Sequence, residues 1–147
     1  MNFILIAILL FGLIGDPEYH GICEDKCKIL TTYVSLSEYE LLCRVCMSEC
    51  GGYDGEPLEG KIAVVETILN RSDIFGMSIE DVVYEQNQYS TAYNGEPDES
   101  VRQAVDIALR CNTYPDDMIY FRTGRYHSFG IPYQQIGNHY FSLKESD

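Results

Sequence analysis

Glu49 is the residue whose type and position carry the clearest chemical signal in this sequence. Leu42, Val45, Cys46 and Glu49 follow one another at helical spacing, so that an acid ends an apolar stripe. A carboxyl held against a core and beside the glycines that follow is poorly solvated, which favours its protonated form. Such a group can donate a proton to a glycosidic oxygen. The alternative interpretation is that Glu49 lies at the end of the helix and extends into solvent, because the same spacing would then be seen.

Polar and aromatic side chains in two later segments form a second group of candidates. Sugar-binding clefts combine rings with amides and hydroxyls, and 12 Tyr and 6 Phe without Trp suit such a cleft, although tyrosines also fill small cores. We expect both segments to bind substrate and to line one groove that passes Glu49. The candidate binding residues are Gln88, Tyr89, Ser90, Tyr120, Phe121 and His139.

The sequence lacks the motifs of several other kinds of catalytic site. The chain has no Gly-rich phosphate loop, no G-x-S-x-G elbow and no H-E-x-x-H pair, and its three histidines are scattered. We therefore expect no cofactor and no catalytic metal. A Cys-His nucleophile pair, Cys50 with His127 or His139, is the rival catalytic hypothesis and would suit a wall amidase or endopeptidase.

Six cysteines leave three interpretations open. Their even number fits a compartment that permits disulfides. They can be buried thiols at helical spacing, they can include at least one disulfide, or four of them can form a thiolate zinc site. The six are Cys23, Cys27, Cys43, Cys46, Cys50 and Cys111, of which the first four would bind zinc.

Composition limits the partners and the location. A length of 147 residues allows one catalytic domain, which we place at residues 35–147. The net charge of −13 opposes binding to nucleic acids and would also repel anionic wall polymers. Residues 1–15 form an apolar run that predicts a signal peptide or membrane anchor, and residues 16–34 form a linker. We expect a secreted or cell-envelope monomer that contacts membrane only through residues 1–15.

The elements that must position these residues are helices first and strands last. Capping signals and apolar periods predict helices from Ser35 to the Gly51-Gly52 stop, over 58–71, after Ser78, and over 97–111. Short aromatic runs between turn residues then predict strands over 118–121, 126–129 and 139–142, with Gly130-Ile131-Pro132 as a turn. The expected fold class is α+β, a small domain of helices followed by a small antiparallel sheet.

Taken in order, the motifs from Leu41 to Ser142 resemble the catalytic domain of the spore-cortex-lytic and cell-wall hydrolase family of the SleB type. Any one motif is weak, but their order along the chain is specific. They are Leu41 to Glu49 with Gly51-Gly52, Gly55-Glu56-Pro57-Leu58-Glu59-Gly60, Ala63-Val64-Val65 with Ile68-Leu69-Asn70-Arg71, Ile79 to Tyr84, Gln88-Tyr89-Ser90, Ile119-Tyr120-Phe121, and Ile136-Gly137-Asn138-His139-Tyr140-Phe141.

The resemblance implies a lysozyme-like fold and cleavage of peptidoglycan between N-acetylmuramic acid and N-acetylglucosamine, in a bacterial or phage-encoded protein. It assigns the catalytic role to Glu49. A transglycosylase would need this one acid, whereas a muramidase that uses water would need a second acid, for which Glu56 and Glu66 are candidates. A non-catalytic peptidoglycan-binding module is the remaining alternative. A few extra residues near 52–56 and the six cysteines depart from the family pattern.

Overall fold

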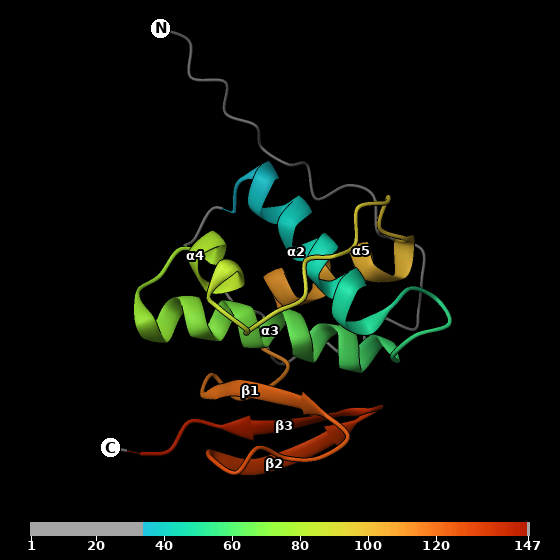
Figure 1. Cartoon of the computed structure of the whole chain (residues 1–147). Helices are drawn as coiled ribbons and strands as arrows, with labels where there is room; N and C mark the ends of the chain where they lie inside the picture. The colour runs from blue at the N-terminus through green and yellow to red at the C-terminus, as the bar shows by residue number, and fades with distance from the viewer. Residues whose placement is uncertain (1–33, 147) are drawn as a thin grey trace, which may run out of the picture.

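The computed structural model describes residues 34–146, in which a group of helices lies over a small sheet (Figure 1). The predicted leader, 1–15, and all but the last residue of the predicted linker, 16–34, lie outside the described residues. The helices are α2 (Leu36–Cys50), α3 (Leu58–Phe75), α4 (Ile79–Tyr84) and α5 (Glu99–Arg110), and the strands are β1 (Met118–Thr123), β2 (Ile131–Ile136) and β3 (His139–Leu143). None of the helices in the described range is long and apolar enough to cross a membrane.

Helix α2 begins and ends where its local sequence signals predict. The Ser35 hydroxyl accepts a hydrogen bond from the backbone N–H of Glu38, whose carboxylate accepts one from the backbone N–H of Ser35. This reciprocal capping box satisfies donors that a helix start leaves open. Gly51, at φ 69°, ends the helix. The expected first helix is confirmed, and Glu49 lies in its last turn.

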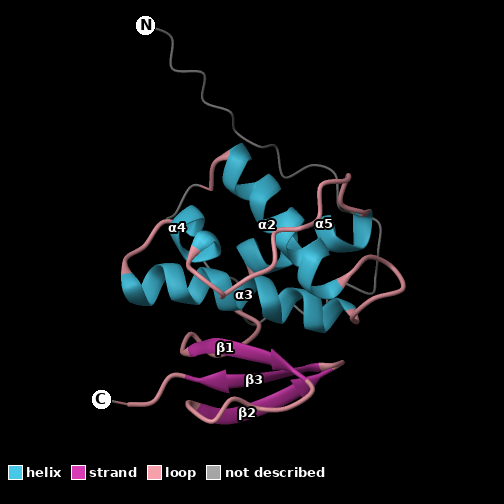
Figure 2. Ribbon diagram, in the orientation of Figure 1, coloured by secondary structure: helices cyan, strands magenta, loops and turns pink. Residues whose placement is uncertain are grey.

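Helix α3 is the central element and lies between the other helices and the sheet (Figure 2). It contacts α2, α4, α5 and β1, and most of its residues from Gly60 to Arg71 are buried. The helix continues beyond the expected end at Arg71 to Phe75, because Gly76 adopts the left-handed conformation (φ 62°) that closes a helix. Helix α5 begins after Asp98, whose carboxylate caps the Val101 N–H, and not at Pro97.

The sheet is antiparallel with strand order β1-β3-β2, so the last strand lies in the middle. One strand prediction and one turn prediction were wrong. The second strand covers Ile131–Ile136, where we expected a turn at its start, and residues 126–129 form a loop. Pro132 is tolerated because β2 is an edge strand. An aromatic side chain of this loop packs against the sheet: Tyr126 lies edge-on to Tyr140 of β3, with ring centroids 5.1 Å apart.

One hydrophobic core joins the helices to the sheet. It is built from α2, α3, α4 and α5 and is closed by side chains of all three strands, including the fully buried Phe141. Gly60 on α3 allows this closure, because Ile136 of β2 lies against it. The structure confirms the predicted α+β class, with helices followed by a small antiparallel sheet.

Candidate active site

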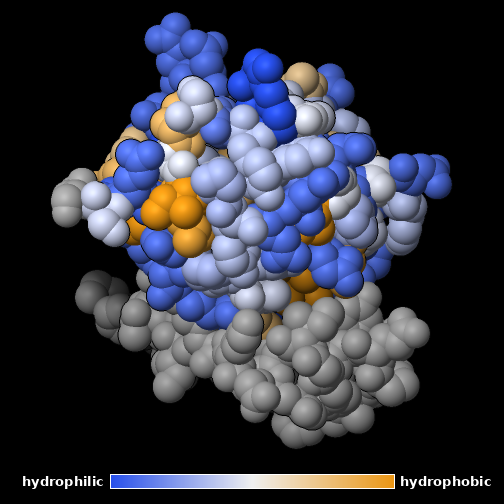
Figure 3. Space-filling model, turned by 90° about the horizontal axis from the view of Figure 1, so that it is seen from below, coloured by the Kyte–Doolittle hydropathy of each residue, from blue (hydrophilic) through white to orange (hydrophobic). Residues whose placement is uncertain are grey.

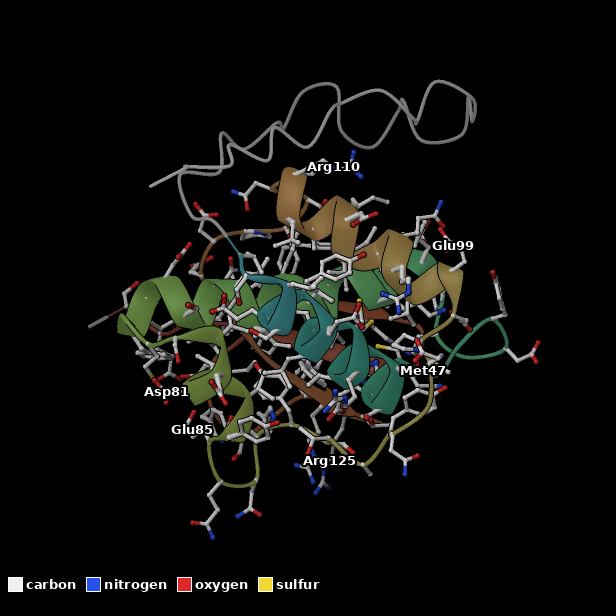
Figure 4. The ribbon with its side chains drawn as sticks, turned by 90° about the horizontal axis from the view of Figure 1, so that it is seen from above. Met47, Asp81, Glu85, Glu99, Arg110 and Arg125 are labelled. Atoms are coloured by element: carbon white, nitrogen blue, oxygen red, sulfur yellow. The ribbon has the colours of Figure 1, made fainter. Side chains whose placement is uncertain are left out.

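The Glu49 carboxylate lies beside the segment that follows α4. Its Oε1 atom accepts a hydrogen bond from the backbone N–H of Ser90. One residue earlier, the Ser48 hydroxyl accepts a hydrogen bond of 3.0 Å from the Tyr93 N–H. Two consecutive residues of α2 therefore hold this segment, which runs past the end of the helix (Figure 4). Glu49 is partly exposed, and Oε2 has no hydrogen-bond donor among the described residues.

A row of rings continues from this segment to the sheet. The ring of Tyr89 lies 5.9 Å from that of Phe121, which lies 5.1 Å edge-on from His139 and 5.7 Å from Phe141. Burial raises the pKa of the Tyr89 phenol, and the nearby charge of Glu49 raises it further. The sequence segments that carry Tyr89, Phe121 and His139 thus meet in one wall near Glu49.

A buried pair, His139 and Glu56, lies next to Phe121. His139 is 2% exposed and Glu56 is 8% exposed, and the Nδ1 atom of the imidazole lies 3.7 Å from Oε1 of the carboxylate. The Glu56 carboxylate accepts a 3.0 Å hydrogen bond from the backbone N–H of Asn138. Burial lowers the pKa of His139, although Glu56 and Glu49 oppose this shift. The imidazole is therefore neutral near pH 7.

Tyr120 does not join this group, which corrects the expectation that Tyr120 and Phe121 share one wall. Successive residues of a strand point to opposite faces of a sheet. Phe121 lies over Phe141, whereas the Tyr120 ring packs 5.1 Å from Phe129 on the other face. Gln88 is exposed two residues before Ser90. The binding roles of all six predicted residues stay predictions.

Sequence reasoning missed Ser48 and the backbone of Asn138, and it considered Glu56 only as a possible second acid and not as a support of the site. Ser48, Glu56 and the backbone of Asn138 hold the loop segments in place. Their signals were local ones, a serine next to the acid and a Gly-Asn turn before His139. Neither signal says which distant segment it will bind.

The Cys50 thiol is better suited to packing in the core than to acting as a nucleophile. Cys50 is 4% exposed, and a hydrogen bond with Cys46 together with burial raises the pKa of its thiol. A nucleophilic cysteine needs the opposite, a stabilised thiolate. His127, one of its two proposed partners, contacts Tyr120 on the far face of the sheet. These observations weigh against the Cys-His hypothesis.

The described cysteines divide into two kinds. Cys43, Cys46 and Cys50 are free and buried, and burial raises the pKa of Cys43 to about 12. Cys111 is disulfide-bonded, so the interpretation with at least one disulfide is confirmed. The hypothetical zinc site includes two cysteines outside the described residues, and within 34–146 no three candidate metal ligands come together.

Comparison with known proteins identifies the family. The family model of the cell wall hydrolases matches residues 55–142, more than half of the chain. The chain belongs to the cell wall hydrolase family. Membership makes it a peptidoglycan-cleaving enzyme and confirms the resemblance noted in the sequence. No curated protein sequence matches the chain significantly.

Two solved structures share the fold of this cell wall hydrolase. The catalytic domain of the germination-specific lytic transglycosylase SleB from Bacillus anthracis is 21% identical, with a TM-score of 0.61, over 77% of this chain and 99% of that one. The catalytic domain of the Bacillus cereus SleB protein is 22% identical, also with a TM-score of 0.61, over 77% of this chain and 94% of that one. The family match starts after Glu49 and does not include this residue.

Proposed function

We propose that this cell wall hydrolase cleaves the bond between N-acetylmuramic acid and N-acetylglucosamine by lytic transglycosylation, with Glu49 as the only catalytic acid and base. The observation that carries the proposal is the position of Glu49. Glu49 lies in the last turn of α2, its carboxylate accepts a hydrogen bond from the Ser90 N–H through one oxygen, and it lies next to the wall formed by Tyr89, Phe121 and His139. Rings and backbone amides of this kind suit a sugar chain.

The proposed reaction uses one carboxyl group twice, first as the acid and then as the base. Protonated Glu49 gives its proton to the glycosidic oxygen while the bond from that oxygen to C1 of the muramic acid breaks, leaving positive charge on C1 and the ring oxygen. The Glu49 carboxylate then removes the proton of the C6 hydroxyl, whose oxygen bonds to C1. The products are a 1,6-anhydro end and a new N-acetylglucosamine end, and Glu49 is protonated again.

The environments of the other two candidate acids support a single-acid route. Glu66 is 2% exposed, and its carboxylate accepts hydrogen bonds from the backbone N–H groups of Thr113 and Tyr114. The buried Glu56 carboxylate likewise accepts a hydrogen bond from the Asn138 N–H. A base that activates water must reach that water across the sugar. Both acids instead hold loops in place, so they are poorly suited to this role.

The test replaces Glu49 by glutamine, which keeps the shape and removes the transferable proton. On purified peptidoglycan we expect Glu49→Gln to lose at least about a hundredfold in turnover. Glu99→Gln, an exposed acid on α5, is the matched control and should retain wild-type turnover within about twofold. Turnover of Glu49→Gln within tenfold of wild type, with an unchanged circular dichroism spectrum, would exclude Glu49 as the acid.

Mass spectrometry of the soluble products decides the reaction type. Lytic transglycosylation gives 1,6-anhydro-muropeptides, whereas hydrolysis gives muropeptides with a reducing muramic acid end. Products with only reducing ends would overturn the single-acid route and would indicate a second acid that activates water. We further propose that the protein acts as an exported monomer, and the Cys111 disulfide supports an oxidising compartment.

A further inference from the structure

The sheet carries a charge opposite to that of the rest of the chain. All 23 acidic residues lie outside residues 118–144, whereas Arg122, Arg125 and Lys144 lie inside this segment. The net charge of the whole chain is −13. A polymer that carries carboxylates is therefore repelled by most of this molecule but attracted by its sheet.

One face of the sheet is turned away from the helices and from the candidate active site. The sheet lies below α3, and no helix of the described range lies beyond it (Figure 2). Successive side chains of a strand point to opposite faces of a sheet. Because Phe121 of β1 packs on the core residue Phe141, its neighbours Tyr120 and Arg122 point away from the core. We call this surface, with the cross-strand partner Tyr140 of Arg122, the outer face.

A row of three polar side chains crosses the outer face. Arg122 of β1 pairs with Tyr140 of β3, which also pairs with Gln135 of β2. Directly paired residues lie side by side on one face of a sheet. The ring of Tyr126 lies edge-on to that of Tyr140, with centroids 5.1 Å apart. The row therefore combines a guanidinium, two phenol rings and an amide, which are groups that bind sugars and their substituents.

The polar groups of this row are available to an external ligand. Arg122 is exposed and has no acidic partner among residues 34–146, whereas Arg71 and Arg102 each form an ion pair with a glutamate. An unpaired arginine can bind a carboxylate with two parallel hydrogen bonds. The amide nitrogen of the exposed Gln135 donates a 3.0 Å hydrogen bond to the Gly137 carbonyl, which orients the amide and leaves its oxygen to accept from a ligand.

The remainder of the outer face is aromatic. Phe129 is 49% exposed, and its ring lies 5.1 Å from Tyr120 and 4.5 Å from His127. Glu145 accepts a hydrogen bond from the Gly130 N–H at this end of the sheet, away from the row. Seen from below, the side on which the sheet lies, the surface is mostly pale to blue with one orange patch (Figure 3). Such a face suits a polar polymer with apolar ring faces better than a second copy of the chain, whose interface would need an apolar centre.

We propose that the outer face is a second, non-catalytic binding site for the peptide-bearing glycan strands of peptidoglycan. Sugar rings lie against Tyr126 and Tyr140, and Arg122 binds a carboxylate of the peptides. The inference goes beyond the proposed function, because it needs the polymer on which the family acts but not Glu49 as the acid. It explains how a chain of net charge −13 stays on an anionic wall while its active site, on the other side of the sheet, remains free.

NMR spectra of the backbone N–H groups of full-length Glu49→Gln protein test this site, with a soluble, peptide-bearing tetrasaccharide of peptidoglycan as the ligand. We expect two sets of signals to shift with different dissociation constants, one from residues 88–93 beside Glu49 and one from Arg122, Gln135 and Tyr140. Arg122→Gln/Tyr140→Leu should weaken binding at the second set about tenfold and leave the first set unchanged. Amidation of the ligand's carboxylates should weaken the second set more in the parent protein than in the double variant.

Arg110→Gln/Leu36→Ala is the matched control, because it also removes one positive charge and reduces one apolar side chain. Leu36 is 79% exposed at the start of α2, on the far side of the helices from the sheet (Figure 1), and Arg110 ends α5. This variant should bind as the parent does. The single variant Arg122→Gln changes only an exposed side chain, so it tests the site independently of any effect of Tyr140→Leu on folding, and it should weaken the second set about threefold.

Three results would overturn the second site. They are no shifts on the outer face of the parent protein, shifts there that the double variant and Arg122→Gln leave unchanged, and equal losses for the control variant. Shifts on the outer face that depend on protein concentration without ligand would show instead that this face joins two copies of the chain. The catalytic assignment fails separately, because cleavage of the tetrasaccharide by Glu49→Gln would reject that assignment alone.

Discussion

At the level of single residues, two acids near the active site differ in their surroundings and therefore in what they can do. Glu56 is buried between His139 and the Asn138 N–H, whereas Glu49 is partly exposed and bound only through one oxygen to Ser90. A proton donor must reach its substrate, whereas a carboxylate that only holds a loop in place need not. Burial and donor count together assign the supporting role to Glu56.

The buried imidazole of His139 predicts a loss of stability in mild acid. Its pKa lies below the ordinary value of 6.5 because of burial, so between the two values the unfolded chain binds a proton that the native protein does not. The free energy of unfolding should therefore fall as the pH decreases below about 6.5. Neighbouring Glu56 and Glu49 favour protonation and reduce the effect without cancelling it.

Urea denaturation at a series of pH values between about 7.5 and 5 measures this decline before most carboxylates titrate. His139→Gln should be less stable at pH 7.5 and should lose less stability on acidification than the wild type. Parallel curves for the two proteins would show that His139 is not the titrating group.

At the level of elements, the turn between β2 and β3 fixes the pair formed by Glu56 and His139. Gly137 has φ 57°, and a Cβ atom there would lie 1.6 Å from Oε2 of Glu56. Gly137→Ala should therefore cost the left-handed backbone strain of about 1 kcal/mol and, in addition, displace the Glu56 carboxylate. We expect a total loss in the free energy of unfolding of about 3 kcal/mol.

Gly76→Ala separates these two contributions. Gly76 has φ 62°, but an added Cβ would meet nothing within 4 Å. This variant should lose only about 1 kcal/mol and keep full activity, while Gly137→Ala loses activity as well. Equal losses in urea denaturation would mean that Glu56 relaxes freely and that the turn does not position it.

At the level of the whole molecule, α2 contributes its free thiols to the core that the helices and the sheet share. Cys43, Cys46 and Cys50 are each no more than 4% exposed. They should react with a maleimide at least about a thousandfold more slowly in the native protein than in urea, because reaction requires the core to open. Peptide mass spectrometry locates the modified cysteines.

Activity should survive maleimide treatment under native conditions, since the proposed chemistry uses no thiolate. Cys50→Ser should also remain active, with a lower free energy of unfolding. Rapid labelling of Cys50 that removes activity would instead support the Cys-His mechanism.

The sequence by itself determined the elements whose signals are local. The capping box at Ser35 and the glycine at the end of α2 lie within or next to the helix that they bound, and the apolar stripe ending at Glu49 is a property of one helix. Helix-forming hydrogen bonds join residues four apart, so such patterns can be interpreted without knowledge of the rest of the chain. The order of motifs from Leu41 to Ser142 was likewise sufficient for the family.

Only the tertiary structure decided the partners of these residues. Ser90 is 41 residues from Glu49, and Asn138 is 82 residues from Glu56. Strand β2 is formed by residues with turn-like composition because an edge strand needs little burial, and the alternation of β1 separates Tyr120 from Phe121. Contacts over such separations depend on how the helices and the sheet pack together. No pattern within one segment encodes them.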